Sequence, residues 1–402
     1  MIYRLAWIIV KLALWVSLRK ITVKGIKNIP ANVPIIFTCN HPMGFMEPLI
    51  IATQIPKIFF FLARGDFFDS TIASWWLEQI NIYPIFRFRD GFHNMRHNES
   101  AISNVTSLLK AGKSFMVFVE GSTKLQRSYR KVQKGASRLM YDMLLDDPDL
   151  DIAIVPIGFN ASDMTTLNAE FNVDIGTPIY ANSLFQQEKS KPKFIKSLTL
   201  QVQTASESLV PQVKSPDDEA LLELAMRYSK VPISLYMQKK IAQKIKLGTY
   251  DEKKAMTTIL HANRDLMQRH HISSHSIKHV PSFIDKLSCL LFLFPFLLST
   301  VFHAIPLSLA KAFTDRKIVN PAFYTIIRFV TCLILVVIWY IIMIPLAVYF
   351  NGLYGLLLLI ILAIVGKYNH VYTNLWRMVK DHLCYHDTIE RIQSIDVLNP
   401  PL

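Results

Sequence analysis

Cysteine is scarce in this chain of 402 residues, and its four copies are scattered rather than grouped. They lack the close spacing of a metal-binding cluster, so the chain predicts no cysteine-based metal site. Cys289 and Cys332 lie in long apolar segments. The distribution predicts free thiols in a reducing compartment, without a structural disulfide.

Acidic residues are also in deficit, because 44 lysines and arginines face 30 aspartates and glutamates, which gives a formal net charge of +14. Such an excess points to an anionic partner, either nucleic acid or an anionic membrane surface. No motif of a nucleic-acid reader accompanies the charge, so we expect no nucleic-acid partner. An apolar content of 51% and several long apolar segments favour the membrane.

The N-terminal segment is apolar but lacks the small-residue cleavage site of a signal peptide. Arg4, Lys11 and Arg19 recur about every two helical turns, which keeps them on one side of a helix. A charged stripe is natural for a helix that lies in the membrane interface. We therefore predict an interfacial helix over residues 1–20, and a spanning helix remains the alternative.

Strand-like and helix-like segments alternate over the next part of the chain. Apolar runs at 21–24, 34–37, 57–63, 114–119 and 171–179 are typical of strands, and 98–110 has the pattern of a helix. The alternation predicts an α/β fold with a mostly parallel sheet and flanking helices. The site of such a sheet forms at the carboxyl ends of its strands. His41, Arg87, Glu120 and Asn160 all lie at or just after expected strand ends.

His41 and Glu47 are the first candidate catalytic pair. They lie in the segment CNHPMGFMEP (39–48), where a turn follows a buried strand and a helix begins. If the turn brings them together, Glu47 can hold one ring nitrogen of His41 while the other accepts a proton from a substrate hydroxyl. Cys39 is near enough in sequence to leave a covalent Cys–His mechanism as an alternative.

Three further blocks give this pair its context. They are PIFRFRD (84–90), FVEGST (118–123) with a following KGA (134–136), and VPIGFN (155–160). In their order and separation, the four blocks resemble the glycerol-3-phosphate and lysophosphatidic acid acyltransferase family over residues 20–180.

The resemblance implies a membrane-bound O-acyltransferase of phospholipid biosynthesis. Such an enzyme moves a fatty acyl group from a thioester donor, acyl-CoA or acyl-acyl carrier protein, to a hydroxyl of glycerol-3-phosphate or lysophosphatidic acid, and needs no cofactor or metal. His41 would be the base, Glu47 would orient it, and Arg87 would bind the acceptor phosphate, as a guanidinium fork can. The remaining implied substrate-binding residues are Glu120, Gly121, Ser122, Thr123 and Lys134.

Two departures from the family pattern weaken the assignment of the substrate but leave the expected fold and reaction class unchanged. Glu47 replaces an aspartate and lies one position further from His41 than is usual. Ser122 and Thr123 stand where many members have a basic residue, which Lys124, Arg127 or Lys134 would have to replace. Another lysophospholipid, a phosphate-free lipid acceptor, or a non-catalytic lipid-binding role therefore stay as alternatives.

The resemblance implies an acyltransferase domain over residues 21–213, and we expect a basic helical region after it at 214–283. Ser215 and Pro216 predict a helix start, and Thr249 with Glu252 predicts a capping box. Four lysines between 239 and 246 form either a solvated face or a contact with anionic headgroups. The histidines between 261 and 279 lack a convincing ligand set, so no metal site is predicted.

A membrane-embedded region is predicted at 284–380, followed by a tail at 381–402. Its apolar segments are 287–309, interrupted by Pro295 and Pro306, then 329–350 and 353–365. Three simple spans would separate the basic clusters, against the positive-inside tendency. We therefore expect a proline-broken re-entrant first segment and then a two-helix hairpin, with the catalytic domain on the cytoplasmic face.

Overall fold

The computed structural model describes residues 2–85, 96–167, 169–188, 190–230 and 234–395. The chain forms two compact units. The first comprises residues 1–164 and 169–210, and the second comprises 165–168 and 211–402.

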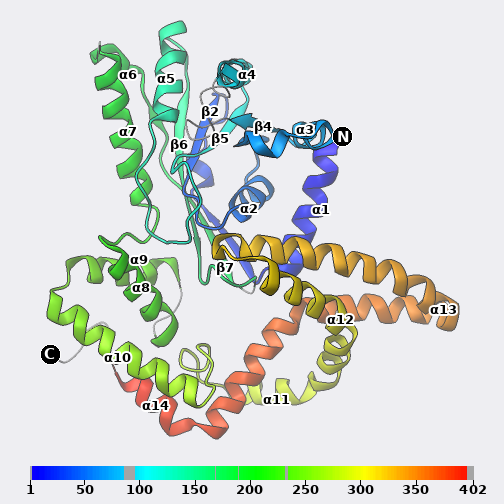
Figure 1. Cartoon of the computed structure of the whole chain (residues 1–402). Coiled ribbons are helices and arrows are strands. Elements are labelled where there is room, and N and C mark those ends of the chain that lie inside the picture. The colour runs from blue at the N-terminus through cyan, green and yellow to red at the C-terminus, as the bar shows by residue number, and fades with distance from the viewer. Residues whose placement is uncertain (1, 86–95, 168, 189, 231–233, 396–402) are drawn as a thin grey trace. The chain divides into compact units, whose positions relative to one another are not determined.

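A single sheet organises the first unit (Figure 1). Its described strands lie in the order β1-β7-β6-β2-β5-β3-β4, with β8 paired to β6. The run β6-β2-β5-β3-β4 is parallel throughout, whereas β7 is antiparallel to β6 and parallel to β1. The predicted mostly parallel α/β sheet is confirmed. The strands are β1 (Lys20–Lys24), β2 (Ile35–Cys39), β3 (Phe59–Arg64), β4 (Ile82–Ile85), β5 (Ser114–Phe118), β6 (Ala153–Ala161), β7 (Glu170–Ile175) and β8 (Ile179–Tyr180).

Helices cover both faces of this sheet because its central strands are buried throughout, and successive side chains of a strand point to opposite faces. Ile36 of β2 packs into a core with helices α5 and α7 on one face, whereas Phe37 meets Phe59 on the other, where α2 and α1 lie (Figure 1). Each such buried side chain contributes about 1.5–3 kcal/mol. The helices are α1 (Ile2–Ser17), α2 (Met46–Gln54), α3 (Thr71–Gln79), α4 (Arg96–Lys110), α5 (Gly135–Asp146), α6 (Asn182–Gln187) and α7 (Lys191–Glu207).

The strand register brings two of the predicted site loops together. Cys39, the last residue of β2, pairs with Phe118, the last residue of β5, so the loops carrying His41 and Glu120 leave the sheet side by side. Asn160 differs from the expectation, because β6 continues past it to Ala161. Its buried side-chain amide donates to the Leu209 carbonyl (3.3 Å), so it contacts that carbonyl rather than the His41 loop.

Helix α1 is attached to the sheet unit through α2, where the Trp7 indole donates to the Ala52 carbonyl (2.9 Å). Its 16 residues extend about 24 Å, which is short of the roughly 30 Å hydrocarbon core of a membrane. Apolar side chains at helical spacing are exposed along it, among them Leu5, Ile8 and Leu12. These features suit the predicted interfacial helix, whose membrane placement stays a prediction.

The second unit is helical, and two of its helices, α8 and α10, begin where the sequence predicts. Ser215 caps α8 by accepting from the Asp218 N–H, and Thr249 with Glu252 forms the capping box of α10. The helices are α8 (Pro216–Tyr228), α9 (Leu235–Leu247), α10 (Tyr250–Arg269), α11 (Phe283–Leu291), α12 (Leu293–Lys317), α13 (Pro321–Cys384) and α14 (His386–Ser394).

Two of the described helices, α12 and α13, are long and apolar enough to cross a membrane. Helix α13 kinks at Gly352, which has φ 55° and ψ −134°, between the two predicted apolar segments. The expected proline break occurs near Pro295, because α11 ends at Leu291, four residues before it, where a proline ring clashes with the helix. The expected break at Pro306 is wrong, since α12 runs unbroken through it. Apolar helices tolerate an internal proline when neighbouring groups satisfy the freed backbone.

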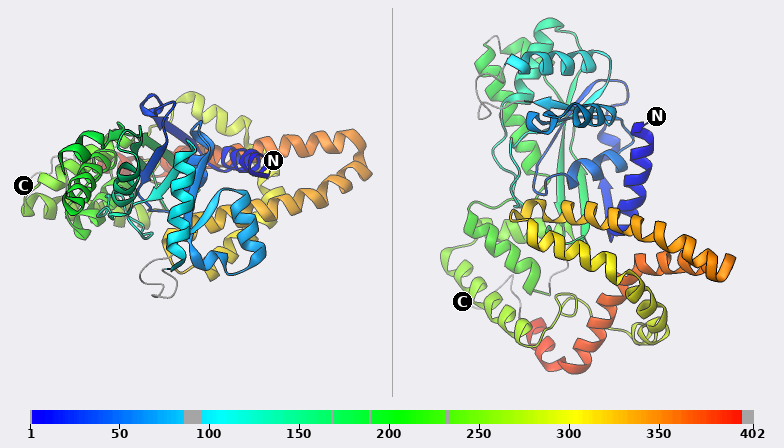
Figure 2. Two further views of the ribbon diagram at one scale, coloured as in Figure 1. Left: turned by 90° about the horizontal axis from the view of Figure 1, so that it is seen from above. Right: turned by 45° about the vertical axis from the view of Figure 1, so that its right-hand side comes forward.

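Helix α12 lies along α13, as both views of Figure 2 show. Polar groups join the two helices. The Ser299 hydroxyl donates to the Leu362 carbonyl (3.2 Å), and His303 Nε2 lies 3.1 Å from the Tyr340 hydroxyl. Gly366 permits this approach, because a Cβ there would lie 2.9 Å from the His303 ring.

Candidate active site

The loop after β2 folds back so that Glu47 approaches His41. Gly44 turns the chain with a φ of 68°, a left-handed conformation that favours glycine. Glu47 then lies in the first turn of α2, where the helix dipole favours a carboxylate. Its Oε1 accepts the Met43 N–H, which fixes the carboxylate inside the turn.

His41 and Glu47 form a close but unbonded pair. His41 Nδ1 lies 3.5 Å from Glu47 Oε2, and neither atom has a hydrogen-bond partner among the described residues. Catalytic hydrogen bonds are often long in unliganded sites and shorten when substrate binds. The Glu47 side chain is fully buried, whereas that of His41 is 17% exposed. The pair therefore has a buried acid and an imidazole that a substrate can reach.

Neighbouring groups hold the imidazole and its backbone in place. The ring stacks on Phe118 of β5 with a centroid separation of 4.2 Å. The His41 N–H donates to Glu120 Oε2 (3.1 Å), which joins the two loops. Asn40 exchanges two hydrogen bonds with the Phe159 backbone (2.9 and 2.7 Å) and so anchors the loop to β6.

Glu120 is paired with Arg130, a residue that the sequence interpretation missed. Arg130 Nη2 and Nε lie 2.6 and 2.9 Å from Glu120 Oε2, and the Arg130 N–H donates to Glu120 Oε1 (2.8 Å). The side chains are 19% and 3% exposed, so the pair is largely withdrawn from water. Gln203 of α7 bonds the backbone of Val132 and Arg130, which holds this segment against the site.

The residues that follow Glu120 in the FVEGST block (118–123), and Lys134 beyond it, have different surroundings. Gly121 has a φ of 70°, and a Cβ there would lie 3.2 Å from the Gln133 side chain, so both backbone and space favour glycine. Ser122 accepts from Arg130 Nη1 through its hydroxyl (2.7 Å). Thr123 is half-buried, and Lys134 is exposed just before α5. Neither of these two side chains bonds another site residue in the described part of the chain.

Besides Lys134, the structure describes the two other basic residues considered as replacements, Arg127 and Lys124. Arg127 is buried, and its guanidinium donates to the carbonyls of Ala161 and Ser162. Lys124 is exposed, and its backbone N–H donates to the His41 carbonyl (3.3 Å). Arg87, the predicted phosphate-binding residue, lies outside the described residues.

Cys39 is unsuited to the covalent alternative. Its side chain is completely buried at the end of β2. Burial raises the pKa of the thiol well above its usual range, and the nearby carboxylates of Glu47 and Glu120 raise it further. Because the thiolate is the nucleophilic form, these surroundings disfavour attack by Cys39.

The first unit is thus an α/β domain with a histidine–carboxylate pair at the carboxyl edge of its sheet. Residues 20–160 match the protein-family model described as Acyltransferase. This segment is therefore a domain of the acyltransferase family, and the predicted family resemblance is confirmed at that level. The match defines neither donor nor acceptor.

A search of the curated proteins found no match. Among solved structures, the chain is similar to the 1-acyl-sn-glycerophosphate (LPA) acyltransferase PlsC from Thermotoga maritima. The sequence identity is 19%, and the match covers 47% of this chain and 72% of that chain with a TM-score of 0.33. A likeness at that score carries no conclusion about substrate.

Proposed function

We propose that this protein is a membrane-bound O-acyltransferase that moves a fatty acyl group from a thioester donor to a hydroxyl of glycerol-3-phosphate or lysophosphatidic acid. The observation that carries the proposal is the His41–Glu47 pair, with 3.5 Å between Nδ1 and Oε2, inside an acyltransferase-family domain. The apolar helices α12 and α13 support a membrane location, which suits a lipid substrate and product.

In the proposed reaction, His41 Nε2 takes the proton of the acceptor hydroxyl while the oxygen attacks the thioester carbonyl. The C–S bond then breaks, and the leaving thiolate receives that proton from His41. Glu47 stabilises the intermediate imidazolium. At 3.5 Å, the attraction of opposite charges is about 5 kcal/mol for an effective dielectric constant of about 20. No enzyme nucleophile is required.

We assign acceptor binding to Arg87 and to the residues of the FVEGST block (118–123) with Lys134. Glu120 holds the His41 loop through the backbone, and Gly121 with Ser122 borders the same turn. Thr123 and Lys134 remain candidates on the exposed side of this segment. Arg87 is proposed as the phosphate ligand on the family resemblance alone.

A phosphate-free acceptor, or a different lysophospholipid, is the second candidate. The contacts of Arg130 favour the phosphate-free acceptor, because Glu120 and Ser122 occupy four of the five N–H groups of this guanidinium. Arg130 therefore has little left to offer a phosphate. Under this alternative, the reaction and the His41 base are unchanged.

An acceptor panel distinguishes these possibilities. Purified full-length protein is incubated with acyl-CoA, or with acyl-acyl carrier protein, and with glycerol-3-phosphate, lysophosphatidic acid, lysophosphatidylcholine or monoacylglycerol. Acylation of either of the first two acceptors supports the primary proposal, and selective acylation of either of the others supports the second candidate. Absence of transfer to every acceptor from both donors contradicts both and favours a non-catalytic lipid-binding role.

A further inference from the structure

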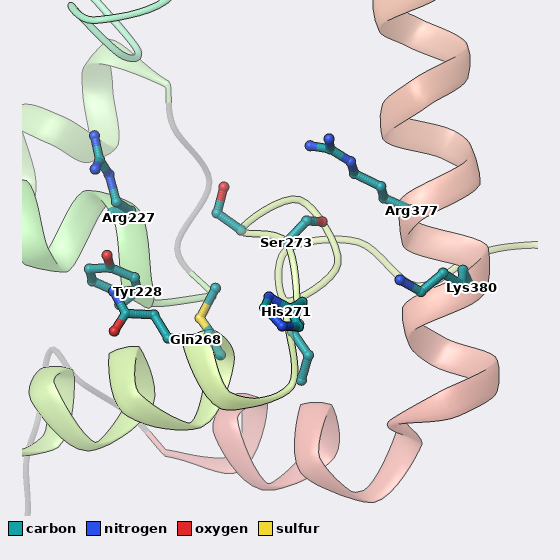
Figure 3. Close-up of a pocket in the computed structure, with 10 residues that line it drawn as sticks. Arg227, Tyr228, Gln268, His271, Ser273, Arg377 and Lys380 are labelled. Carbon is teal, nitrogen blue, oxygen red and sulfur yellow. The ribbon is translucent and has the colours of Figure 1, made fainter.

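A pocket of about 500 Å³ opens in the second unit, between the ends of α8 and α10, the loop after α10, and α13 (Figure 3). It is separate from the His41 loop in the chain and is formed wholly by residues of the second unit. We call it the basic pocket. Its principal polar lining residues are Arg227, Gln268, His271, Ser273, Arg377 and Lys380.

The charge of the basic pocket is one-sided. Arg227, Arg377 and Lys380 line it, and none of its described lining residues is an aspartate or glutamate. Figure 3 shows the side chains of Arg377 and Lys380 extending from α13 toward the loop that carries His271 and Ser273. Cations from separate elements thus converge on one cavity without an acidic residue in its wall.

Local helix electrostatics explains only part of this arrangement. Arg227 lies in the last turn of α8, where the helix dipole favours a cation. Arg377 and Lys380 precede the last turn of α13, so that reason does not apply to them. Lys380 Nζ lies 3.8 Å from Asp381 Oδ1, whereas Arg377 bonds none of the residues that the structure describes. Arg377 therefore has its guanidinium available to a ligand.

The walls of the basic pocket are held in place by buried contacts. Asp381, 1% exposed, accepts the Ser273 N–H (2.9 Å) and the Ser276 hydroxyl (2.7 Å) through Oδ2, which fixes the loop to α13. Lys278 Nζ donates to the Met226 carbonyl (2.7 Å) and fixes the same loop to α8. A ligand that enters meets a site that is already formed, which lowers the entropy cost of binding.

We propose that the basic pocket binds the phosphate group of an anionic ligand. The guanidinium fork of Arg377 and the Lys380 ammonium are donors suited to phosphate oxygens. Both a lipid headgroup and a water-soluble phosphate ester carry this chemistry. Arg377 lies 12 residues beyond the apolar segment that ends at residue 365, or about 18 Å along a straight helix, so an upright helix would place it outside the headgroup layer.

Calorimetric titration of the full-length protein with inorganic pyrophosphate, in uncharged detergent at fixed ionic strength, tests the proposal. The doubly substituted R377Q/K380Q protein should bind about a hundredfold more weakly than wild type, about tenfold for each lost charge-assisted contact. The matched control K240Q/K246Q removes the same charge from α9, outside the pocket, and should bind within about threefold of wild type. An unchanged thermal unfolding midpoint shows that each variant is folded.

Two results overturn the proposal: wild-type protein that does not bind pyrophosphate, or equal weakening in the pocket and control variants. The single substitution R377K keeps the charge and removes the fork, so it should still weaken binding measurably.

The source of the phosphate follows from the same titration in nanodiscs. If the ligand is a lipid headgroup, phosphatidylglycerol discs should weaken pyrophosphate binding by wild-type protein relative to phosphatidylcholine discs. If it is a soluble ester, the two discs should give the same affinity. Both outcomes support a phosphate site, and the R377Q/K380Q protein should keep its weakened pyrophosphate affinity without a dependence on the lipid.

Discussion

Removal of the Arg130 side chain should destabilise the sheet unit because it leaves Glu120 with an unpaired buried charge. The Glu120 side chain is only 3% exposed, and Arg130 provides its sole described ion pair, at 2.6 Å. Breaking one partner of a buried pair typically costs about 3–5 kcal/mol. Two backbone N–H groups, of His41 and Arg130, still bond the carboxylate in the variant. We therefore expect Arg130→Gln to cost about 3 kcal/mol, the lower end of that range.

A double-mutant cycle measures this pairing directly. Urea unfolding of full-length protein in nonionic detergent gives the stability of wild type, Arg130→Gln, Glu120→Gln and the double variant. The double variant should be more stable than the sum of the single effects by about 2 kcal/mol, because the second substitution removes the charge that the first left unpaired. Lys124→Gln removes an exposed cation of the same segment and should change stability by less than about 0.5 kcal/mol.

Loss of the Arg130–Glu120 pair should also lower the rate of acyl transfer, because Glu120 accepts the His41 N–H. A shifted Glu120 shifts the base, and misplacement on the order of 1 Å can cost about a hundredfold in rate. Additive single effects, or a cost of less than about 1 kcal/mol for Arg130→Gln, would refute the buried-pair account.

Two further substitutions test the surroundings of the site and the helix pair. Cys39→Ala should keep most of the acyl-transfer rate, and native Cys39 should alkylate far more slowly at pH 8 than the exposed Cys384, because its raised pKa keeps the thiol uncharged until the pH approaches that value. Loss of activity, or equal alkylation rates by peptide mass spectrometry, would restore the covalent mechanism. Gly366→Ala should lower thermal stability by about 1–3 kcal/mol, since its Cβ would lie 2.9 Å from the His303 ring. Gly135→Ala adds the same atom into open space as a control, and equal effects would contradict this packing.

Local sequence signals predict much of the fold. The run at 34–37 identifies β2 because an apolar stretch bounded by turn residues is typical of a buried strand. Thr249 and Glu252 identify the start of α10 because a capping box is a local interaction between residues three apart. Gly352 marks the kink in α13 for the same reason, since its backbone conformation is local. Pro306 misled the interpretation because an apolar helix can retain an internal proline.

The candidate site was predictable only in part. His41 and Glu120 each follow a strand, and parallel pairing of β2 with β5 is enough to bring them together. Arg130 was not identifiable in this way, since the segment after Gly121 must fold back before its side chain can reach Glu120. Arg127 is nearer in sequence, but its guanidinium bonds carbonyls at the end of β6 and beyond. Which of several nearby cations meets an acid depends on tertiary structure.

The most direct test of the central proposal is transfer of a radiolabelled acyl group from acyl-CoA or acyl-acyl carrier protein to the preferred acceptor, measured for wild-type protein and His41→Ala. The ring of His41 is partly exposed and makes no hydrogen bond to a described residue, so the variant should fold with a similar unfolding midpoint. We expect its rate to fall by at least about a hundredfold, the lower limit of a general-base contribution. A variant that is folded and transfers the acyl group at the wild-type rate would contradict the assignment of His41 as the base.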